Sequence, residues 1–334
     1  MKGIQTLHSH TTLSDGQMSH LEVLNCAQQY GISVVAFTDH DVLPSESIIQ
    51  ELKLHNHKTK WICGIEISSG LPKELGGGTF PGLHITGLFV DPTNQKLLEY
   101  SEKALNARIG RMEKMVKNLQ SLGFDISEKD CLTASGGEAV GRLHIVQALK
   151  VKQKNLDIIE ALRIRMSQET DEKIKIKYKN MMQKGETQYP FLLFLSEDPY
   201  IPNIYVDYLY WEDMDSVVKL IRDAGGLAFI AHYSTAKKKI PLEMMEQIIK
   251  SKRVDGVEVV YGMRAYEYQD WKKDMEWLSQ KADQYQILKS GGADLHSKEQ
   301  IELFVQMKEF SQKTIGMAEK IIEKSGVDTT WSSC

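Results

Sequence analysis

The sequence LHSHTTLSDG at residues 7–16 places two histidines, His8 and His10, one residue apart near the start of the chain, with Asp15 shortly after them. Residues 3–7 are typical of a short strand. Side chains on a strand alternate between its two faces, so both imidazoles are expected to point to the same side, where they can bind one metal ion. A His-x-His pair alone is weak evidence, because it also occurs on half-buried strands that bind no metal.

Composition limits the classes of function. The chain has 334 residues, 42% of them hydrophobic, and its net charge of −4 argues against binding to long duplex DNA. The four cysteines show no Cys-x-x-Cys spacing, and we expect free thiols in a reducing compartment. We expect no signal peptide and find no apolar run long enough to cross a bilayer, which predicts a cytoplasmic protein without a membrane partner.

Strand-like and helix-like segments alternate along the first part of the chain. Residues 32–38 and 61–67 are apolar runs of the length of buried strands, and 83–90 is a further strand. Ser19 and Glu22 have the spacing of a capping box at the start of a helix that Gly31 ends. The alternation resumes near residue 211, with strands expected at 227–231, 254–260 and 286–289. This pattern predicts a parallel α/β barrel, whose chemistry lies at the C-terminal ends of the strands.

The alternation is interrupted after Asp91. Residues 95–122 predict one long helix, and its apolar residues at helical spacing are interpreted as core packing: Leu98, Leu105, Ile109, Met112, Val116 and Leu119. Residues 143–184 are also expected to be helical. We therefore predict a helical insertion at 100–190 between barrel segments 1–99 and 191–334. Residues 189–211 are rich in aromatic side chains, and two interpretations stay open: a loop over the site, or a satellite core or dimer contact.

Polar residues at the ends of the predicted strands form a candidate metal site. They are His8, His10, Asp15, His40, Glu66, His84, His232, Asp294 and His296. Six of the ten histidines fall in this set, so ordinary core histidines explain it poorly. A barrel brings the strand ends to one rim. Nine ligands are too many for one tetrahedral ion and suit two or three divalent ions such as manganese, zinc or iron.

The motifs resemble the PHP (polymerase and histidinol phosphatase) superfamily of metal-dependent phosphoesterases. The matching stretches are LHSHTTLSDG (7–16), AFTDHD (36–41), GIEIS (64–68), LHITG (83–87), GRLHIVQAL (141–149), AGGLAFIAH (224–232), VDGVEV (254–259) and GGADLH (291–296). They follow the family order over nearly the whole chain. The resemblance is to the stand-alone branch that acts on nucleoside 3′,5′-bisphosphates and the 5′ ends of short oligoribonucleotides. It implies a distorted (β/α)7 barrel with a helical insertion.

The resemblance also implies roles for the predicted ligands. It assigns one ion to His8, His10, Glu66 and Asp294, a second to Glu66, His84 and His232, and a third to Asp15, His40 and His296. Glu66 is then the bridging carboxylate, and a hydroxide between two ions attacks the phosphoester, because such a hydroxide is a nucleophile at neutral pH. The implied partner is a nucleotide or short single-stranded RNA or DNA.

Other residues are candidates for substrate contacts. Arg142 and His144 form the Arg-x-His pair of the insertion, and either both bind a substrate phosphate or His144 protonates the leaving oxygen. The ordinary alternative is a pair at a helix N-terminus. Tyr189 aligns with a family tyrosine and can stack on a base. Arg108 is a weaker candidate, for which a solvated helix face is the favoured interpretation.

Asp39 and Asp41 flank His40. We expect Asp39 to orient an imidazole, and for both residues the alternative is a solvated turn.

Other functions remain open. A histidinol-phosphatase-like enzyme acting on a small molecule belongs to the same superfamily, but the Arg-x-His pair speaks against it. A non-catalytic metal-binding interaction module is a second alternative, disfavoured because all nine ligand positions are filled. A toxin or defence nuclease is a third, which the acidic net charge weakens.

Overall fold

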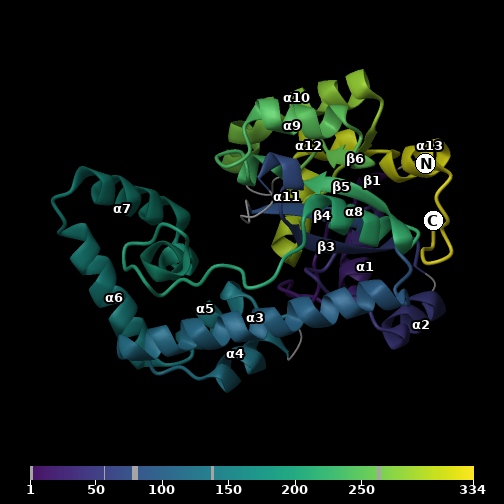
Figure 1. Ribbon diagram of the computed structural model, residues 1–334. Helices are drawn as coiled ribbons and strands as arrows, with labels where there is room; N and C mark the ends of the chain where they lie inside the picture. The colour runs from purple at the N-terminus through teal and green to yellow at the C-terminus, as the bar shows by residue number, and fades with distance from the viewer. Residues whose placement is uncertain (1–2, 56, 77–81, 137–138, 262–264) are drawn as a thin grey trace. The chain divides into compact units, whose positions relative to one another are not determined.

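The computed structural model describes residues 3–55, 57–76, 82–136, 139–261 and 265–334. The chain divides into two compact units. Unit 1 comprises residues 1–104 and 211–334, and unit 2 comprises residues 105–210. Figure 1 labels their helices and strands where there is room.

A seven-stranded sheet forms the centre of unit 1, and its strands are neighbours in their sequence order. The strands are β1 Ile4–Thr6, β2 Ile32–Phe37, β3 Lys60–Ser69, β4 Leu83–Leu88, β5 Leu227–Ala231, β6 Gly256–Glu258 and β7 Leu288–Ser290. The segments that follow β1 and β7 are joined by backbone hydrogen bonds, from Leu7 N to Gly291 O (3.0 Å) and from His10 N to Leu295 O (2.7 Å). The sheet is therefore curled and barrel-like, and the predicted α/β class is confirmed.

The prediction that all strands run parallel is wrong for β4. This strand pairs antiparallel with both β3 and β5, whereas the other neighbouring pairs are parallel. A parallel pair needs a crossover of a dozen or more residues that usually contains a helix. Between β3 and β4 the described residues form only one short 3-10 turn, η1 Lys73–Leu75. The chain therefore turns back, and the first residues of β4 lie at the sheet edge where β3 ends.

Amphipathic helices cover the sheet of unit 1. They are α1 His20–Gln29, α2 Glu46–Leu54, α8 Met214–Asp223, α9 Leu242–Lys250, α10 Ala265–Tyr285, α11 Lys298–Gln306, α12 Lys308–Ser311 and α13 Met317–Ser325, with 3-10 turns η4 Tyr233–Thr235 and η5 Gln312–Thr314. The predicted capping box of Ser19 and Glu22 opens α1. Helix α8 packs closely on β4 at Gly87, where a Cβ would lie 3.1 Å from the side chain of Ile221.

Unit 2 is helical. Helix α3 Gln95–Ser121 runs from unit 1 into unit 2 and is followed by α4 Glu128–Ser135, α5 Arg142–Lys150, α6 Gln153–Ser167, α7 Glu172–Lys184, the 3-10 turn η2 Glu186–Gln188 and the π-helix η3 Phe191–Leu195. Met112, Val116 and Leu119 are buried in its core as expected, whereas Leu98, in unit 1, is exposed. Residues 143–184, which were expected to be helical, lie in three successive helices. One break occurs where the Asp171 carboxylate accepts the Lys173 N–H (2.7 Å) and starts α7.

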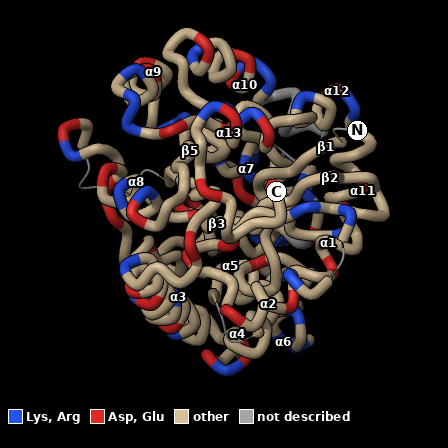
Figure 2. The backbone as a smooth tube through the Cα atoms, turned by 90° about the vertical axis from the view of Figure 1, so that its right-hand side faces the viewer, with Lys and Arg blue, Asp and Glu red and all other residues tan. Residues whose placement is uncertain are grey.

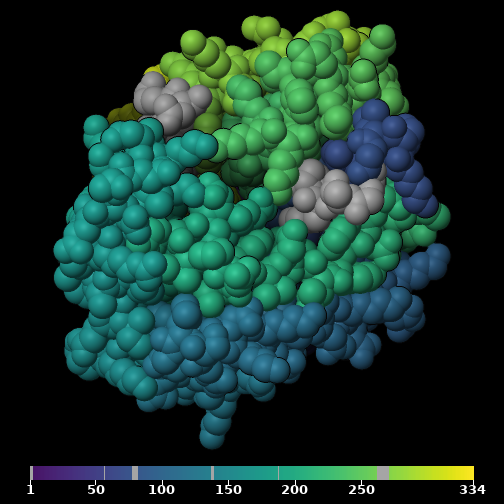
Figure 3. Space-filling model, turned by 60° about the vertical axis from the view of Figure 1, so that its left-hand side comes forward, coloured from purple at the N-terminus to yellow at the C-terminus, as the bar shows by residue number. Residues whose placement is uncertain are grey.

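The aromatic stretch 189–211 contributes to the core of unit 2. Leu193, Phe194 and Leu195 are fully buried, and the Phe194 ring lies 5.3 Å from that of Phe124. These contacts agree with the satellite-core interpretation. Figure 3 shows the residues after η3 as a green-teal band beside the blue surface of α3.

The four cysteines are free thiols, as predicted. Among the described residues, no helix combines the length and hydropathy that crossing a bilayer requires. In the view of Figure 2, acidic and basic residues of the described chain are interspersed on the outer helices.

Candidate metal centre

The two histidines of the opening motif point to the same side, as their spacing predicts. They follow β1 directly, both are buried, and their Nε2 atoms lie 3.2 Å apart. Backbone hydrogen bonds to residues 291–295 hold the extended chain that carries both histidines. A Cβ on Gly292 would lie 2.6 Å from His8 N, so only glycine allows this close approach of the two segments.

Glu66 and Asp294 complete a first group around these imidazoles. Glu66 Oε2 lies 3.3 Å from the Nε2 atoms of both His8 and His10. Asp294 Oδ1 lies 3.4 Å from His8 Nε2 and 3.0 Å from His10 Nε2. Ligands about 2.0–2.1 Å from a tetrahedral zinc ion are about 3.3 Å from one another. The atoms of His8, His10 and Glu66 therefore have the mutual spacing of ligands on one ion, and Asp294 Oδ1 lies beside both imidazoles.

The second carboxylate oxygen of Glu66 faces a different pair of histidines. Glu66 Oε1 lies 2.8 Å from His84 Nδ1 and 2.7 Å from His232 Nε2. His84 reaches this edge because β4 is antiparallel, and it pairs in register with Ser68 and Ala231. Glu66 thus presents one oxygen to each group, which is the arrangement of a bridging carboxylate.

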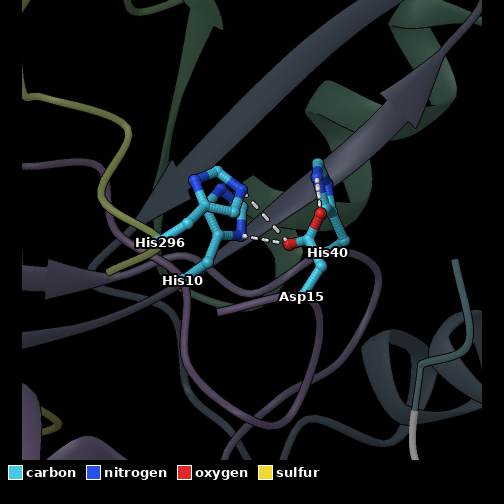
Figure 4. A group of neighbouring side chains, drawn as sticks. All are labelled: His10, Asp15, His40 and His296. Atoms are coloured by element: carbon cyan, nitrogen blue, oxygen red, sulfur yellow. Dashed lines mark ion pairs between the residues drawn. The ribbon is translucent and has the colours of Figure 1, made fainter. Parts of the chain in front are cut away.

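A third group gathers around Asp15. Its carboxylate lies 3.3 Å from His296 Nε2, 3.7 Å from His10 Nδ1 and 3.9 Å from His40 Nε2, as Figure 4 illustrates. The other ring nitrogen of His40 lies 2.9 Å from Glu66 Oε2. His10 and His40 therefore connect the third group to Glu66. The structure brings all nine sequence-predicted residues together in unit 1.

The donor set fits divalent metal ions. Four buried atoms of these residues lack a hydrogen bond of acceptable geometry to any described residue: Asp15 Oδ1, His40 Nδ1, Glu66 Oε2 and Asp294 Oδ1. Buried carboxylate oxygens without partners are costly unless a cation neutralises them. Imidazole nitrogens and carboxylate oxygens are ligands of zinc, manganese and iron. The cluster therefore suits divalent ions.

The pKa values reflect this crowding. Burial alone would lower the pKa of His8, but Glu258, Glu66 and Asp294 raise it well above its usual value. The pKa of His10 rises to about 10 despite burial, mainly through Asp294 and Glu66. Burial would raise the pKa of Glu66, yet the surrounding imidazoles, led by His40, hold it well below its usual value. The site is thus a network of imidazoles and ionised carboxylates.

Backbone strain occurs at the same edge. His232 and Asp294 adopt positive φ angles of 26° and 51°, which side chains other than glycine rarely adopt, and Asp41 beside His40 has a φ of 57°. Such conformations persist where the surrounding structure enforces them, and they are common at functional sites.

Asp39 faces an imidazole, but that of His20, which is not among the predicted ligands: His20 Nε2 lies 3.8 Å from Asp39 Oδ2. Its carboxylate accepts hydrogen bonds from Thr11 N (2.7 Å), Thr11 Oγ1 (2.9 Å) and Ser14 Oγ (2.6 Å), and so holds the loop that carries Asp15. The solvated alternative is also wrong, because Asp39 and Asp41 are both buried. Asp41 accepts hydrogen bonds from Ser68 N (3.2 Å) and Tyr100 Oη (3.0 Å).

Sequence reasoning missed Glu258, at the end of β6. This fully buried carboxylate lies 2.7 Å from His8 Nδ1 through Oε1 and accepts the His232 N–H through Oε2 (2.8 Å). It therefore contacts two of the predicted ligands from behind. The available signal was a carboxylate, Glu258, flanked by valines within the strand expected at 254–260.

The predicted substrate residues lie in unit 2. The Arg142 Nη1 group donates to Leu195 O (3.0 Å), and the buried His144 accepts the Gly141 N–H at Nδ1 (2.9 Å). A neutral His144 ring consequently carries its proton on Nε2. Tyr189 is partly exposed, and its hydroxyl lies 3.6 Å from Met182 Sδ.

Known proteins resemble the chain over most of its length, although no family model matches. A 5′-3′ exoribonuclease of Haemophilus influenzae is 24% identical over 294 residues, covering 87% of this chain and 89% of the relative. A 3′,5′-nucleoside bisphosphate phosphatase of Chromobacterium violaceum is 23% identical over 298 residues, covering 87% and 86%. The resemblance to PHP-type phosphoesterases is confirmed. The predicted enzyme class, a phosphoester hydrolase, is confirmed with it, because both relatives are named for reactions at phosphoester bonds.

A solved structure also resembles the fold of this chain. It is described as an amidohydrolase from Chromobacterium violaceum with bound sulfate and no metal. It matches with a TM-score of 0.63 at 22% identity, covering 88% of this chain and 87% of that one. Which of the nine side chains bind metal stays a prediction.

Proposed function

We propose that this chain hydrolyses phosphate esters of nucleotides, acting on nucleoside 3′,5′-bisphosphates or on the 5′ ends of short oligoribonucleotides. The observation that carries the proposal is the position of Glu66, whose two oxygens face separate histidine groups at 2.7–3.3 Å. The two curated relatives, an exoribonuclease and a bisphosphate phosphatase, support both substrate classes.

The site holds two or three divalent ions, of manganese, zinc or iron. His8, His10, Glu66 and Asp294 hold one; Glu66, His84 and His232 hold a second; Asp15, His40 and His296 hold a third. Bound divalent ions lower the pKa of water and neutralise the charge of a phosphate. The chain contributes fixed ligands, because Glu258 and Asp39 anchor His8 and the loop of Asp15 from behind. Glu66 has the catalytic role of bridging the two groups.

Unit 2 corresponds to the helical insertion of a distorted (β/α)7 barrel and supplies the substrate contacts. Arg142 and His144 bind a phosphate of the substrate, and Tyr189 stacks on its base. For His144 the geometry favours hydrogen-bond donation over proton delivery. A protonated ring would direct Nδ1–H at the Gly141 N–H, and two donors would then face each other. The substrate is single-stranded, and the protein works in the cytoplasm.

Phosphate release tests this function. The purified chain is incubated with Mn²⁺ and adenosine 3′,5′-bisphosphate, a 5′-phosphorylated RNA trinucleotide or histidinol phosphate. We expect release from the first or trimming of the second, and loss of both in Glu66→Gln with an unchanged circular dichroism spectrum. Exclusive turnover of histidinol phosphate would favour the small-molecule phosphatase. Metal binding without turnover of any phosphoester would favour the non-catalytic metal-binding module.

A further inference from the structure

A group of arginines and tyrosines in unit 2 is not explained by the fold of that unit. Arg111 in α3 is only 6% exposed, and its Nη2 atom has no hydrogen-bond partner among the described residues. The guanidinium carbon lies 4.2 Å from the ring centre of Tyr208 and 5.2 Å from that of Tyr205. The only hydrogen bond that Arg111 makes to a described residue runs from Nε to Val206 O (2.7 Å).

Positive charges gather around Arg111. Arg142 lies over the ring of Tyr205 as well, at 5.6 Å, and over Phe191 at 5.8 Å. Burial lowers the pKa of Arg111, and the charges of Arg142 and Arg108 lower it further. No described carboxylate forms an ion pair with Arg111. Glu197 and Asp207 lie near enough to influence Tyr205. A buried guanidinium without an anion is costly, and the tyrosine faces offset only part of that cost.

We propose that Arg111 and Arg142, backed by Tyr205 and Tyr208, bind a phosphate group of the nucleotide substrate. Guanidinium groups present paired N–H donors that match phosphate oxygens, and one phosphate can face both arginines. It would satisfy Arg111 Nη2 and offset the repulsion between the two cations. Arg142, Tyr205 and Tyr208 are partly exposed, so the cluster is open to solvent on that side. The inference rests on the proposed nucleotide substrate and assigns it a recognition site in unit 2.

Calorimetric titration of the full chain in EDTA tests this site without catalysis. The probes are 5′-AMP and adenosine, which differ only in the phosphate. We expect Arg111→Gln to weaken 5′-AMP binding roughly 10- to 100-fold, as for the loss of charge-assisted hydrogen bonds, and to change adenosine binding less than twofold. The matched control is Arg165→Gln, because Arg165 also lies over a tyrosine, Tyr200, in unit 2. This control should bind both probes as the wild type does.

Three outcomes overturn the inference: a wild type that does not bind 5′-AMP, a variant affinity for 5′-AMP within twofold of wild type, or an equal loss for both probes. If Arg111→Gln fails to fold by circular dichroism, Arg111→Lys decides by the same criteria, because lysine keeps the charge and lacks the paired donors. Absence of phosphate release from the metal-loaded wild type would refute the proposed enzyme activity and leave this binding result to be judged separately.

Discussion

Replacing Glu258 with glutamine should weaken metal binding while leaving the barrel folded. Glu258 accepts two hydrogen bonds, one from His8 Nδ1 and one from the backbone N–H of His232. The first bond places the proton of a neutral His8 ring on Nδ1, so that the Nε2 lone pair faces Glu66 and Asp294. A carboxylate behind a metal-binding imidazole thus fixes both the tautomer and the ring orientation.

Glutamine cannot make both bonds. With its oxygen towards His8, its NH2 group faces the His232 N–H, and two buried donors meet at a cost of about 1–3 kcal/mol. With its NH2 group towards His8, the imidazole must accept at Nδ1 and carry its proton on Nε2, where it no longer binds metal. Loss of such a supporting partner typically weakens metal affinity about 10- to 100-fold, equivalent to about 1.4–2.8 kcal/mol.

The assay is competition for Mn²⁺ between the protein and a fluorescent chelator. The matched control is Asp255→Asn. Asp255 directly precedes β6, at the opposite end of the strand, and accepts the Ala228 N–H (2.8 Å) and a pair of bonds from Arg222. The control should lower the melting temperature without changing Mn²⁺ affinity. A folded Glu258→Gln variant with wild-type Mn²⁺ affinity would refute the reasoning.

Three further predictions follow from the same contacts. Asp39→Asn should destabilise the chain by about 1–3 kcal/mol in urea unfolding, since an amide cannot accept all three hydrogen bonds from Thr11 and Ser14; wild-type stability would contradict this. The pKa of His10 is about 10 in the metal-free fold and 6.5 in the unfolded chain, so protonation of His10 stabilises that fold fully below pH 6.5, and this stabilisation is lost as pH rises towards 10. The rise in melting temperature that Mn²⁺ causes should therefore grow from pH 6.5 to 9. A constant or shrinking rise would refute this prediction. Burial raises the pKa of Cys131 to about 12, so a disulfide reagent at pH 8 should label it only after denaturation, and rapid labelling of Cys131 in the native chain would count against the buried position.

Local patterns predicted which nine side chains gather in unit 1, since each lies in a short motif at or soon after a strand end. The spacing of His8 and His10 alone fixes their common direction. The antiparallel run of β4 was harder to predict, because it depends on the connection between β3 and β4 and not on the apolar content of the strand. His84 nevertheless lies at the same edge of the sheet as the other predicted ligands, because an antiparallel strand begins where its neighbour β3 ends, and His84 is near the start of β4.

The contacts made from behind the site were not predicted: Glu258 was missed, and Asp39 was expected to orient an imidazole and not to hold the loop of Asp15. The partners of Glu258 and Asp39 are residues far away in the sequence, and some of the contacts are to backbone groups. Neither kind of contact produces a periodic pattern in the sequence. Arg111 is similar. An arginine on an amphipathic helix suggests a solvated face, and its burial depends on Tyr205 and Tyr208, which lie many residues later in the chain.

The central claim is that Glu66 joins two metal positions that are both needed for hydrolysis. The most direct measurement titrates the metal-stripped chain with Mn²⁺ and follows phosphate release from adenosine 3′,5′-bisphosphate, or trimming of the trinucleotide, against bound metal. The account predicts little activity at the first equivalent, a steep rise as the second binds, and none at any loading of Glu66→Gln. Full activity at one equivalent of Mn²⁺ would contradict it, and so would full activity in EDTA or full activity of the Glu66→Gln variant.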